Sequence, residues 1–187
     1  MNVHLPTHMG KQAFLAWVRG REERYELADG RVVMMVGASR AHGMLVGNLL
    51  VVMHGQLDPQ RWTVITDFGL DAGPETLRYP DIVVDRAGGA GGDYTATEPV
   101  MIAEVLSPTT EAVDLGDKAA EYLKLPSLRA YLILAQDRCK AWLWVRQTNG
   151  FGAGATIIVG LDKIIHIGPL SLQLPLAALY AGIDVGP

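Results

Sequence analysis

One carboxylate lies inside a run of residues that otherwise belongs in a hydrophobic core. Residues 100–106 read Val-Met-Ile-Ala-Glu-Val-Leu, and Ser107-Pro108 follows them. An apolar run of this length, closed by a proline turn, is typical of a central strand that is covered on both faces. An ionised carboxylate loses several kcal/mol when it leaves water without a partner. Glu104 therefore requires a cation, and the fold has to bring one to it.

Two other segments supply candidate neighbours for Glu104. Residues 79–84 read Tyr-Pro-Asp-Ile-Val-Val, so Asp81 directly precedes a second run of β-branched residues. Downstream, Asp114, Lys118 and Tyr122 recur every four residues, which places them on one face of a predicted helix. Two acids on neighbouring strands and a lysine on the next helix would form a divalent-metal site, and such a site points to hydrolysis.

Composition indicates a folded, globular protein. The chain has 187 residues, 49% hydrophobic and 19% charged, so we expect one domain over residues 1–187 with a substantial core. The net charge of −4 argues against non-specific coating of nucleic acid, although it allows a local basic patch. Cys139 is the single cysteine, which excludes an intrachain disulfide and suits a reducing, cytoplasmic setting. No signal peptide and no apolar stretch of ~18 residues is visible, so we expect no membrane contact.

The order of the predicted elements favours an α/β (α+β) protein with a mixed sheet. The central series is helix, strand, strand, strand, helix, strand, and its strand–helix–strand step predicts a parallel pair. The elements that we predict are a helix over 10–19, a hairpin over 23–36 around Asp29-Gly30, a helix from the N-cap Ser39 to 56, strands over 62–70, 77–85 and 99–106, a helix over 111–124, strands over 130–135, 141–145, 155–159 and 170–174, and a helix over 175–181.

Each candidate residue also has an ordinary structural interpretation. Asp81 alone caps a turn and Glu104 alone forms a buried salt bridge, whereas the pair favours Mg²⁺ or Mn²⁺, which prefer carboxylate oxygens. Lys118 either positions a water and offsets phosphate charge, or pairs with Asp114 on a solvated face. Glu26, beside the first hairpin turn, is either a third acid near the metal, an orienting group or a solvent-facing strand residue.

The remaining polar and aromatic candidates are interpreted as structural. Tyr122 either hydrogen-bonds the site or packs in the core. His42 lies near a predicted helix start, and no histidine shows the spacing of a metal ligand. Trp142 and Trp144 share one strand face, which favours core or interface packing.

Five segments form a combination that is more specific than any one of them. They are Tyr25-Glu26-Leu27-Ala28-Asp29-Gly30, Tyr79-Pro80-Asp81-Ile82-Val83-Val84, Ile102-Ala103-Glu104-Val105-Leu106-Ser107-Pro108-Thr109-Thr110, Asp114-Leu115-Gly116-Asp117-Lys118 with Tyr122, and Tyr131-Leu132-Ile133-Leu134. Together they resemble the Uma-type family (the second Uma class) of restriction endonucleases over about residues 12–182. That family is placed in the PD-(D/E)XK nuclease superfamily.

The resemblance implies a restriction-endonuclease-like core that agrees with the element order above. Asp81 matches the superfamily's first acid, which follows a proline, and Glu104 matches the second. The usual lysine position holds Leu106 here, which departs from the superfamily pattern. The family moves its lysine onto the next helix, where Lys118 matches, and Glu26 matches its extra acid in the first hairpin.

From the residues and the resemblance we expect a deoxyribonuclease that depends on Mg²⁺ or Mn²⁺. Asp81 and Glu104 are expected to bind the metal with the backbone carbonyl of Val105, while Lys118 positions the attacking water and Glu26 assists. Two alternatives stay open: a non-catalytic dimeric interaction module on the same fold, and a metal-dependent hydrolase of RNA or a small phosphoester.

We expect DNA as the partner and a homodimer as the form that binds it. Few basic residues are available to one chain of net charge −4, and cleavage of both strands of a duplex needs two sites. Trp142, Trp144 and the apolar C-terminal strands are the candidate dimer surface.

Overall fold

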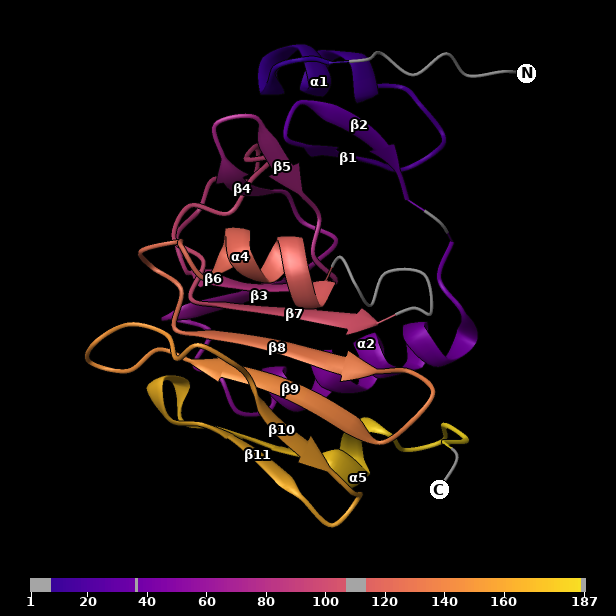
Figure 1. The fold of residues 1–187 in the computed structure, drawn as a ribbon, viewed down its shortest axis with the longest axis vertical. Helices are drawn as coiled ribbons and strands as arrows, with labels where there is room; N and C mark the ends of the chain where they lie inside the picture. Colours follow the sequence, from indigo (N-terminus) through magenta and orange to yellow (C-terminus); the bar gives the residue numbers. More distant parts are fainter. Residues whose placement is uncertain (1–7, 36, 107–113, 186–187) are drawn as a thin grey trace.

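The apolar run around Glu104 forms the middle of the central sheet. The computed structural model describes residues 8–35, 37–106 and 114–185. Strand β7 (Met101–Leu106) is buried at every residue, and it lies between β6 (Ile82–Arg86) and β8 (Ala130–Ala135). The pair β7–β8 is parallel and the other pairs in this sheet are antiparallel. The protein is therefore α+β with a mixed central sheet, as the element order predicted (Figure 1).

The other elements extend this sheet or cover it. The central sheet has the order β10-β9-β8-β7-β6-β3, and a second sheet has the order β2-β1-β5-β4. The remaining strands are β1 (Tyr25–Ala28), β2 (Arg31–Met34), β3 (Trp62–Thr66), β4 (Leu70–Gly73), β5 (Thr76–Arg78), β9 (Lys140–Val145), β10 (Thr156–Val159), β11 (Ile164–Ile167) and β12 (Leu172–Pro175). The helices are α1 (Lys11–Val18), α2 (Arg40–His54), the π-helix η1 (Asp114–Lys118), α4 (Ala119–Tyr122), the 3-10 helix η2 (Gly168–Leu170) and α5 (Leu176–Leu179).

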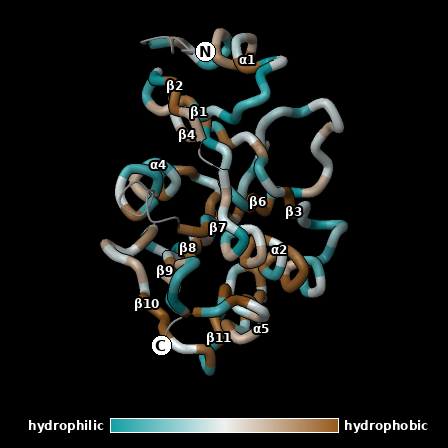
Figure 2. Tube along the Cα trace, turned by 90° about the vertical axis from the view of Figure 1, so that its right-hand side faces the viewer, coloured by the Kyte–Doolittle hydropathy of each residue, from teal (hydrophilic) through white to brown (hydrophobic). Residues whose placement is uncertain are grey.

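Alternation along β7 assigns its side chains to two different helices. Ala103 and Val105 belong to the core that α2, α5 and the β11–β12 hairpin cover. Ile102 and Leu106 belong to the core beneath α4. Because side chains alternate along a strand, Glu104 shares the α4 face. Figure 2 shows the hydrophobic strands of the sheet between α4 on one side and α2 on the other.

The second sheet has a core of its own under α1, built around Phe14 and Leu27. Its β1–β2 turn consists of Asp29 and Gly30, with φ values of 46° and 72°. An Asp-Gly pair suits this turn because both residues adopt a left-handed backbone there. The hairpin predicted around this pair is therefore present.

The structure corrects three predicted boundaries. The strand expected over 77–85 is two strands in different sheets, β5 and β6, because Pro80 has no N–H for a ladder hydrogen bond. The strand expected over 62–70 ends at Thr66, and Asp67 then turns the chain with a φ of 53°. The helix expected over 111–124 begins, within the described residues, as a π-helix at Asp114, and residues 111–113 lie outside them.

The C-terminal region corrects two further expectations. The strand expected over 170–174 is β12, and it pairs with β11, which the sequence analysis did not predict. Trp142 and Trp144 are 6% and 8% exposed, and the Trp144 ring stacks on Tyr131 at 5.4 Å between centroids. Both tryptophans therefore pack in the core, which was one of the two interpretations of their shared face, and they do not form the expected dimer surface. None of the helices in the described ranges has the length and apolar character needed to span a bilayer.

Candidate active site

Glu104 finds its cation in Lys118. The Glu104 carboxylate, on a residue that is 3% exposed, accepts a hydrogen bond at Oε1 from Lys118 Nζ at 2.9 Å. Tyr122 donates its hydroxyl to the same oxygen at 3.1 Å. The other oxygen, Oε2, accepts a long bond of 3.4 Å from the backbone N–H of Asp81. The strand residue, the helix lysine and the first acid thus meet at one place.

The π-helix η1 directs Lys118 into this cluster. Lys118 Nζ lies 2.9 Å from Asp114 Oδ1 and 3.9 Å from Glu26 Oε1, in addition to its contact with Glu104. The Asp114 contact is an ion pair without hydrogen-bond geometry, since Asp114 Oδ1 is buried and has no hydrogen-bond partner among the described residues. Lys118 thus pairs with Asp114 and also contacts the site, but both residues are buried, so the solvated face expected for the Asp114 pair is wrong. Short π-helical turns are frequent at functional sites.

Asp81 lies directly before β6, on the edge where β7 ends. Because Ile82 pairs with Ala103 across antiparallel strands, Asp81 is placed beside the carboxyl half of β7. Its Oδ2 accepts the backbone N–H of Val105 at 2.7 Å and lies 3.2 Å from Nε2 of His42. Its side chain is 17% exposed, so it faces outward more than Glu104 does.

His42 is a site residue that sequence reasoning missed. It lies in the first turn of α2, where Ser39 accepts the His42 N–H at 3.1 Å as the N-cap. The Ser39 hydroxyl also hydrogen-bonds the buried side chain of Gln136, which directly follows β8. The N-cap pattern predicted where α2 begins, but it could not show that this end of the helix lies against Asp81.

Glu26 reaches the cluster from β1 and is held there by Arg78. The residue is 5% exposed. Its Oε2 accepts from Arg78 Nη1 at 3.2 Å, and its Oε1 accepts the backbone N–H of Tyr79 at 3.1 Å. Arg78 also binds both oxygens of Glu121 in α4, at 2.8 and 2.7 Å. This buried arginine, which the sequence analysis did not single out, connects the second sheet to the helix after β7.

The cluster contains more carboxylates than cations, and its pKa values reflect this. Burial raises the pKa of Glu104 to about 8, and the charges of Asp81 and Asp114 add to the effect while Lys118 opposes it. Burial alone would lower the pKa of Lys118, but the charges of Glu104, Glu26 and Asp114 raise it above its usual range. Lys118 therefore stays protonated, and Glu104 loses its proton at a higher pH than an ordinary carboxyl group does.

Two further groups are tuned by the same acids. Burial, followed by the charge of Glu104, raises the pKa of Tyr122 well above its ordinary value, so its hydroxyl stays a neutral donor. Burial lowers the pKa of His42, but the hydrogen bond to Asp81 and the charge of Asp81 outweigh it and raise the pKa above 6.5.

Comparison with known proteins identifies the family. The sequence profile of the Uma2 family, described as "Putative restriction endonuclease", matches residues 12–176. The chain belongs to the Uma2 family. It is 26% identical over 149 residues to one uncharacterized protein of Synechocystis sp. strain PCC 6803, covering 76% of each chain. It is 29% identical over 119 residues to another from the same organism, covering 61% of this chain and 67% of the relative.

A solved structure shows the same fold. The crystal structure of "a putative nuclease belonging to DUF820" from Anabaena variabilis matches with a TM-score of 0.76. The match covers 92% of this chain and 98% of that one at 16% sequence identity. At this identity the likeness concerns the fold alone.

Uma2 membership raises the question of whether the cluster suits a divalent metal. Within residues 8–35, 37–106 and 114–185, no group of three or more His, Cys, Asp or Glu side chains is arranged to hold an ion. Mg²⁺, however, keeps several waters and is usually held by one or two carboxylates plus substrate phosphate. Asp81 and Glu104 supply oxygens of the preferred type, and a cation there would offset the surplus of carboxylates. The donor set therefore fits a hydrated divalent ion.

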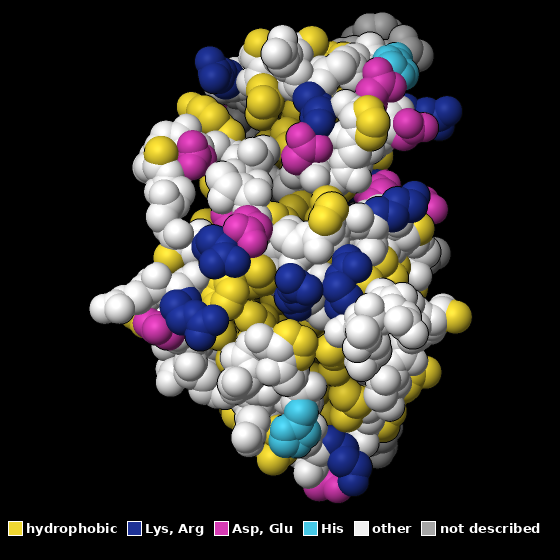
Figure 3. Space-filling model, turned by 90° about the vertical axis from the view of Figure 1, so that its left-hand side faces the viewer, with side chains coloured by type: hydrophobic (Ala, Val, Ile, Leu, Met, Phe, Trp, Pro, Cys, Tyr) yellow, Lys and Arg dark blue, Asp and Glu magenta, His cyan; other side chains and the backbone are white. Residues whose placement is uncertain are grey.

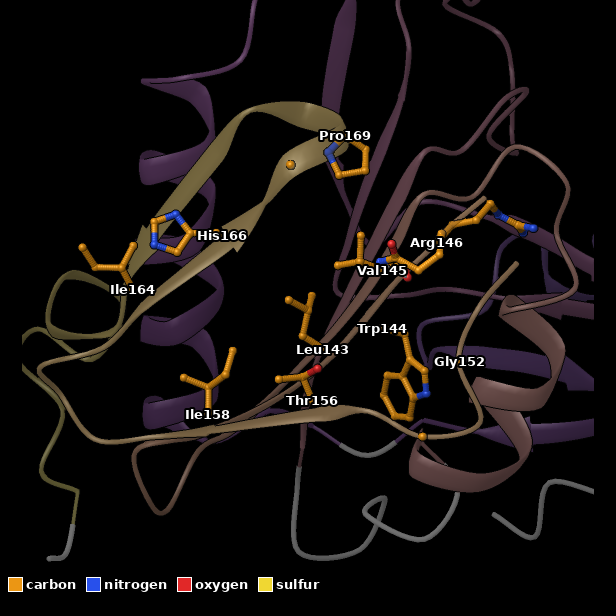
Figure 4. Close-up of a pocket in the computed structure, with 13 residues that line it drawn as sticks. Leu143, Trp144, Val145, Arg146, Gly152, Thr156, Ile158, Ile164, His166 and Pro169 are labelled. Carbon is orange, nitrogen blue, oxygen red and sulfur yellow. Dashed lines mark hydrogen bonds between the residues drawn. The ribbon is translucent and has the colours of Figure 1, made fainter. Parts of the chain in front are cut away.

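A pocket of about 690 Å³ lies elsewhere in this Uma2 protein, between β9, β10 and β11 (Figure 4). Its described lining includes Arg146 and His166 but no Asp or Glu. Arg146 is already engaged, because it donates to the carbonyls of Leu125 and Leu128 at 2.7 and 2.6 Å. This pocket therefore lacks the acid chemistry of the cluster around Glu104.

Proposed function

We propose that this protein is a metal-dependent endonuclease that hydrolyses DNA phosphodiesters. The observation that carries the proposal is the convergence of Asp81, Glu104 and Lys118 from three elements on one buried cluster. Membership of a family described as restriction endonucleases supports the same activity. An acid pair with a fixed cation is suited to phosphodiester hydrolysis because the reaction develops negative charge on the phosphate.

Asp81 and Glu104 are the proposed ligands of Mg²⁺ or Mn²⁺, together with the backbone carbonyl of Val105. When bound, such an ion polarises a phosphoryl oxygen and lowers the pKa of a water. The protein holds Asp81 through the Val105 N–H, and it holds Glu104 through Lys118 and Tyr122. Both carboxylates are thus oriented before substrate arrives, which reduces the cost of assembling the reactive geometry.

Lys118 is proposed to position the attacking water and to offset charge on the scissile phosphate. Because carboxylates surround it, Lys118 is a permanent cation and hydrogen-bond donor, not a base. Glu26 is proposed to assist indirectly, through Lys118. Arg78 and the Tyr79 N–H bind its two oxygens, and it lies 3.9 Å from the lysine. Its proposed role is to keep Lys118 in place.

The DNA-binding form that we propose is a dimer, because the basic side chains of one molecule do not gather beside its acids. Figure 3 shows the side of the molecule on which β7 begins, where Lys and Arg gather in a band across the middle. That side is turned away from the end of β7 where the acids lie (Figure 1). A chain of net charge −4 has few cations for the rest of its surface. We propose a homodimer because cleavage of both strands of a duplex needs two sites, and because two chains together offer the DNA more cations than one.

The test is cleavage of supercoiled plasmid by the purified protein with Mg²⁺ or Mn²⁺. Asp81→Asn and Lys118→Ala each remove one member of the cluster. The matched controls are Asp162→Asn and Lys163→Ala, which alter an acid and a lysine that pair on the surface. We expect metal-dependent nicking or linearisation by the wild type and both controls, and loss of it in the two cluster variants.

Three other results would change the conclusion. Equal cleavage by all preparations would identify a contaminant. Cleavage of RNA or of a small phosphoester, but not of DNA, in parallel assays would change the proposed substrate class and leave the proposed active site unchanged. No cleavage of any of these substrates by the wild type would leave the non-catalytic interaction module as the function of the fold.

A further inference from the structure

Asp81 receives two donors on the same oxygen. Its Oδ2 accepts the Val105 N–H at 2.7 Å and lies 3.2 Å from His42 Nε2. Within the described part of the chain, no hydrogen bond reaches Oδ1 of Asp81. Because an ionised carboxylate only accepts hydrogen bonds, Nε2 of His42 must carry the hydrogen in this contact. The arrangement directs one oxygen of Asp81 into the protein and leaves the other for a ligand.

The position of His42 is itself determined by the sheet. Ser39 caps α2 through the His42 N–H, and the Ser39 hydroxyl bonds to Gln136 at the end of β8. The first turn of α2 is thereby attached to the carboxyl end of the parallel strands. His42 and Asp81 are only 16% and 17% exposed at their side chains, so water competes weakly for the contact between them.

We propose that His42 is the positioning residue for Asp81, holding its Oδ2 so that Oδ1 faces a bound divalent cation. The inference rests on the proposed function, because it assumes that Asp81 is a metal ligand. Val105 N–H alone fixes the carboxylate at one point and leaves rotation about the Cβ–Cγ bond. A second donor on the same oxygen restricts that rotation. Residues that hold a ligand in this way commonly change metal affinity by about 10- to 100-fold when they are removed.

The test is a calorimetric titration of the full-length protein with Mn²⁺, without DNA. His42→Phe keeps a planar ring but removes the donor, His42→Ala removes ring and donor, and His42→Gln restores an N–H donor. His54→Phe is the matched control, because His54 is an exposed histidine in the last turn of the same helix. Asp81→Asn tests the metal site itself, and a thermal melt checks that each variant is folded.

We expect His42→Phe and His42→Ala to weaken Mn²⁺ binding about tenfold and His42→Gln to stay within about threefold of the wild type. His54→Phe should bind as the wild type does, and Asp81→Asn should bind no Mn²⁺. Cleavage by His42→Phe should recover as Mn²⁺ is raised, because a positioning defect affects loading of the site.

Two results would overturn the inference while leaving the proposed function intact. One is unchanged Mn²⁺ affinity in both donor-less variants, with binding still abolished in Asp81→Asn. The other is a larger loss in His42→Gln than in His42→Phe, which would show that ring packing is what matters. A failure of the proposed metal site has a different signature, namely no Mn²⁺ binding by the wild type or wild-type binding by Asp81→Asn.

Discussion

Lys118 Nζ lies 2.9 Å from Glu104 Oε1, and the two side chains are 9% and 4% exposed. A buried ion pair gains little net stability over an apolar pair, because both charges lose their water. Removing one partner is far more costly, since it leaves an uncompensated charge in the core. The pair is therefore a point at which a conservative substitution should affect folding and activity together.

Lys118→Met keeps the length of the lysine stem and removes its charge. We expect loss of cleavage and a decrease of about 3 kcal/mol in the free energy of unfolding at pH 9. At pH 5 the decrease should be smaller, because Glu104 can take up a proton and no longer needs a cation. Urea unfolding at the two pH values measures this, with the exposed Lys163→Met as the control. An equal decrease at both pH values would contradict the explanation.

Metal binding should depend on pH through Glu104. Its folded-state pKa, about 8, lies above the ordinary value of 4.5. Since a metal ligand must be deprotonated, we expect Mn²⁺ affinity to rise between pH 6 and pH 8 and to level off above. Calorimetry in two buffers with different ionisation enthalpies should also detect proton release near pH 7. Pronounced affinity at pH 6 without proton release would show that Glu104 is already ionised.

The same shift has a consequence for stability without metal. Between pH 4.5 and about 8 the folded protein retains a proton on Glu104 that the unfolded chain has lost. The contribution of this group to the free energy of unfolding therefore falls as pH rises through that window. Glu104→Gln removes the titration, so its unfolding free energy should fall less than that of the wild type over the same range. Parallel pH profiles for the two proteins would argue against a raised pKa.

Metal addition should stabilise the folded protein, and chelation should reverse the effect. A ligand at 100 times its dissociation constant, bound only by the folded state, adds about 2.7 kcal/mol to the free energy of unfolding. We expect a gain of this size with Mn²⁺ and none with EDTA in chemical denaturation of the wild type. Asp81→Asn should show no gain. A similar gain in that variant would place the ion at another site.

Two arginines with similar bonds allow a comparison of buried and exposed pairs. Arg78 binds both oxygens of Glu121 and also Glu26, and it is 5% exposed. Arg86 binds both oxygens of Glu98, but its side chain is 57% exposed. We expect Arg78→Met to lower the free energy of unfolding by about 3 kcal/mol, because it leaves buried carboxylates without a cation. Arg86→Met should unfold close to the wild type in the same urea titration, since water screens its pair. Similar losses in both variants would mean that burial does not determine the cost.

Local patterns predicted most of the fold. Asp29-Gly30 predicted the first hairpin, Ser39 predicted the start of α2, and the strand–helix–strand step predicted the parallel pair β7–β8. These features depend on neighbours in the sequence, on hydrogen bonds within one turn or on the length of one connection. Two of the errors arose where a local run was interrupted for reasons of backbone chemistry. Pro80 divides an apolar run into strands of two sheets, and Asp67 ends a strand by its left-handed backbone.

The cluster itself was only partly visible in the sequence. An acid in a buried run has to find a cation, so the need of Glu104 for a partner followed from solvation alone. Which groups met it did not, since Arg78 and Glu26 are 52 residues apart and touch only because β5 pairs with β1. His42 was taken for an ordinary helix residue because its contact with Asp81 depends on how α2 lies against the sheet.

By itself, then, the sequence determined most of the elements, the order of the central ones and the chemical requirement at Glu104, because these follow from short-range sterics and from the cost of burying charge. The tertiary structure alone decided that Lys118 is the cation that pairs with Glu104, that Arg78 holds Glu26, and that His42 lies against Asp81. These contacts join elements that are distant in the chain. The packing of α2 and α4 on opposite faces of β7 brings His42 and Lys118 to the cluster, and the pairing of β5 with β1 brings Arg78 to Glu26.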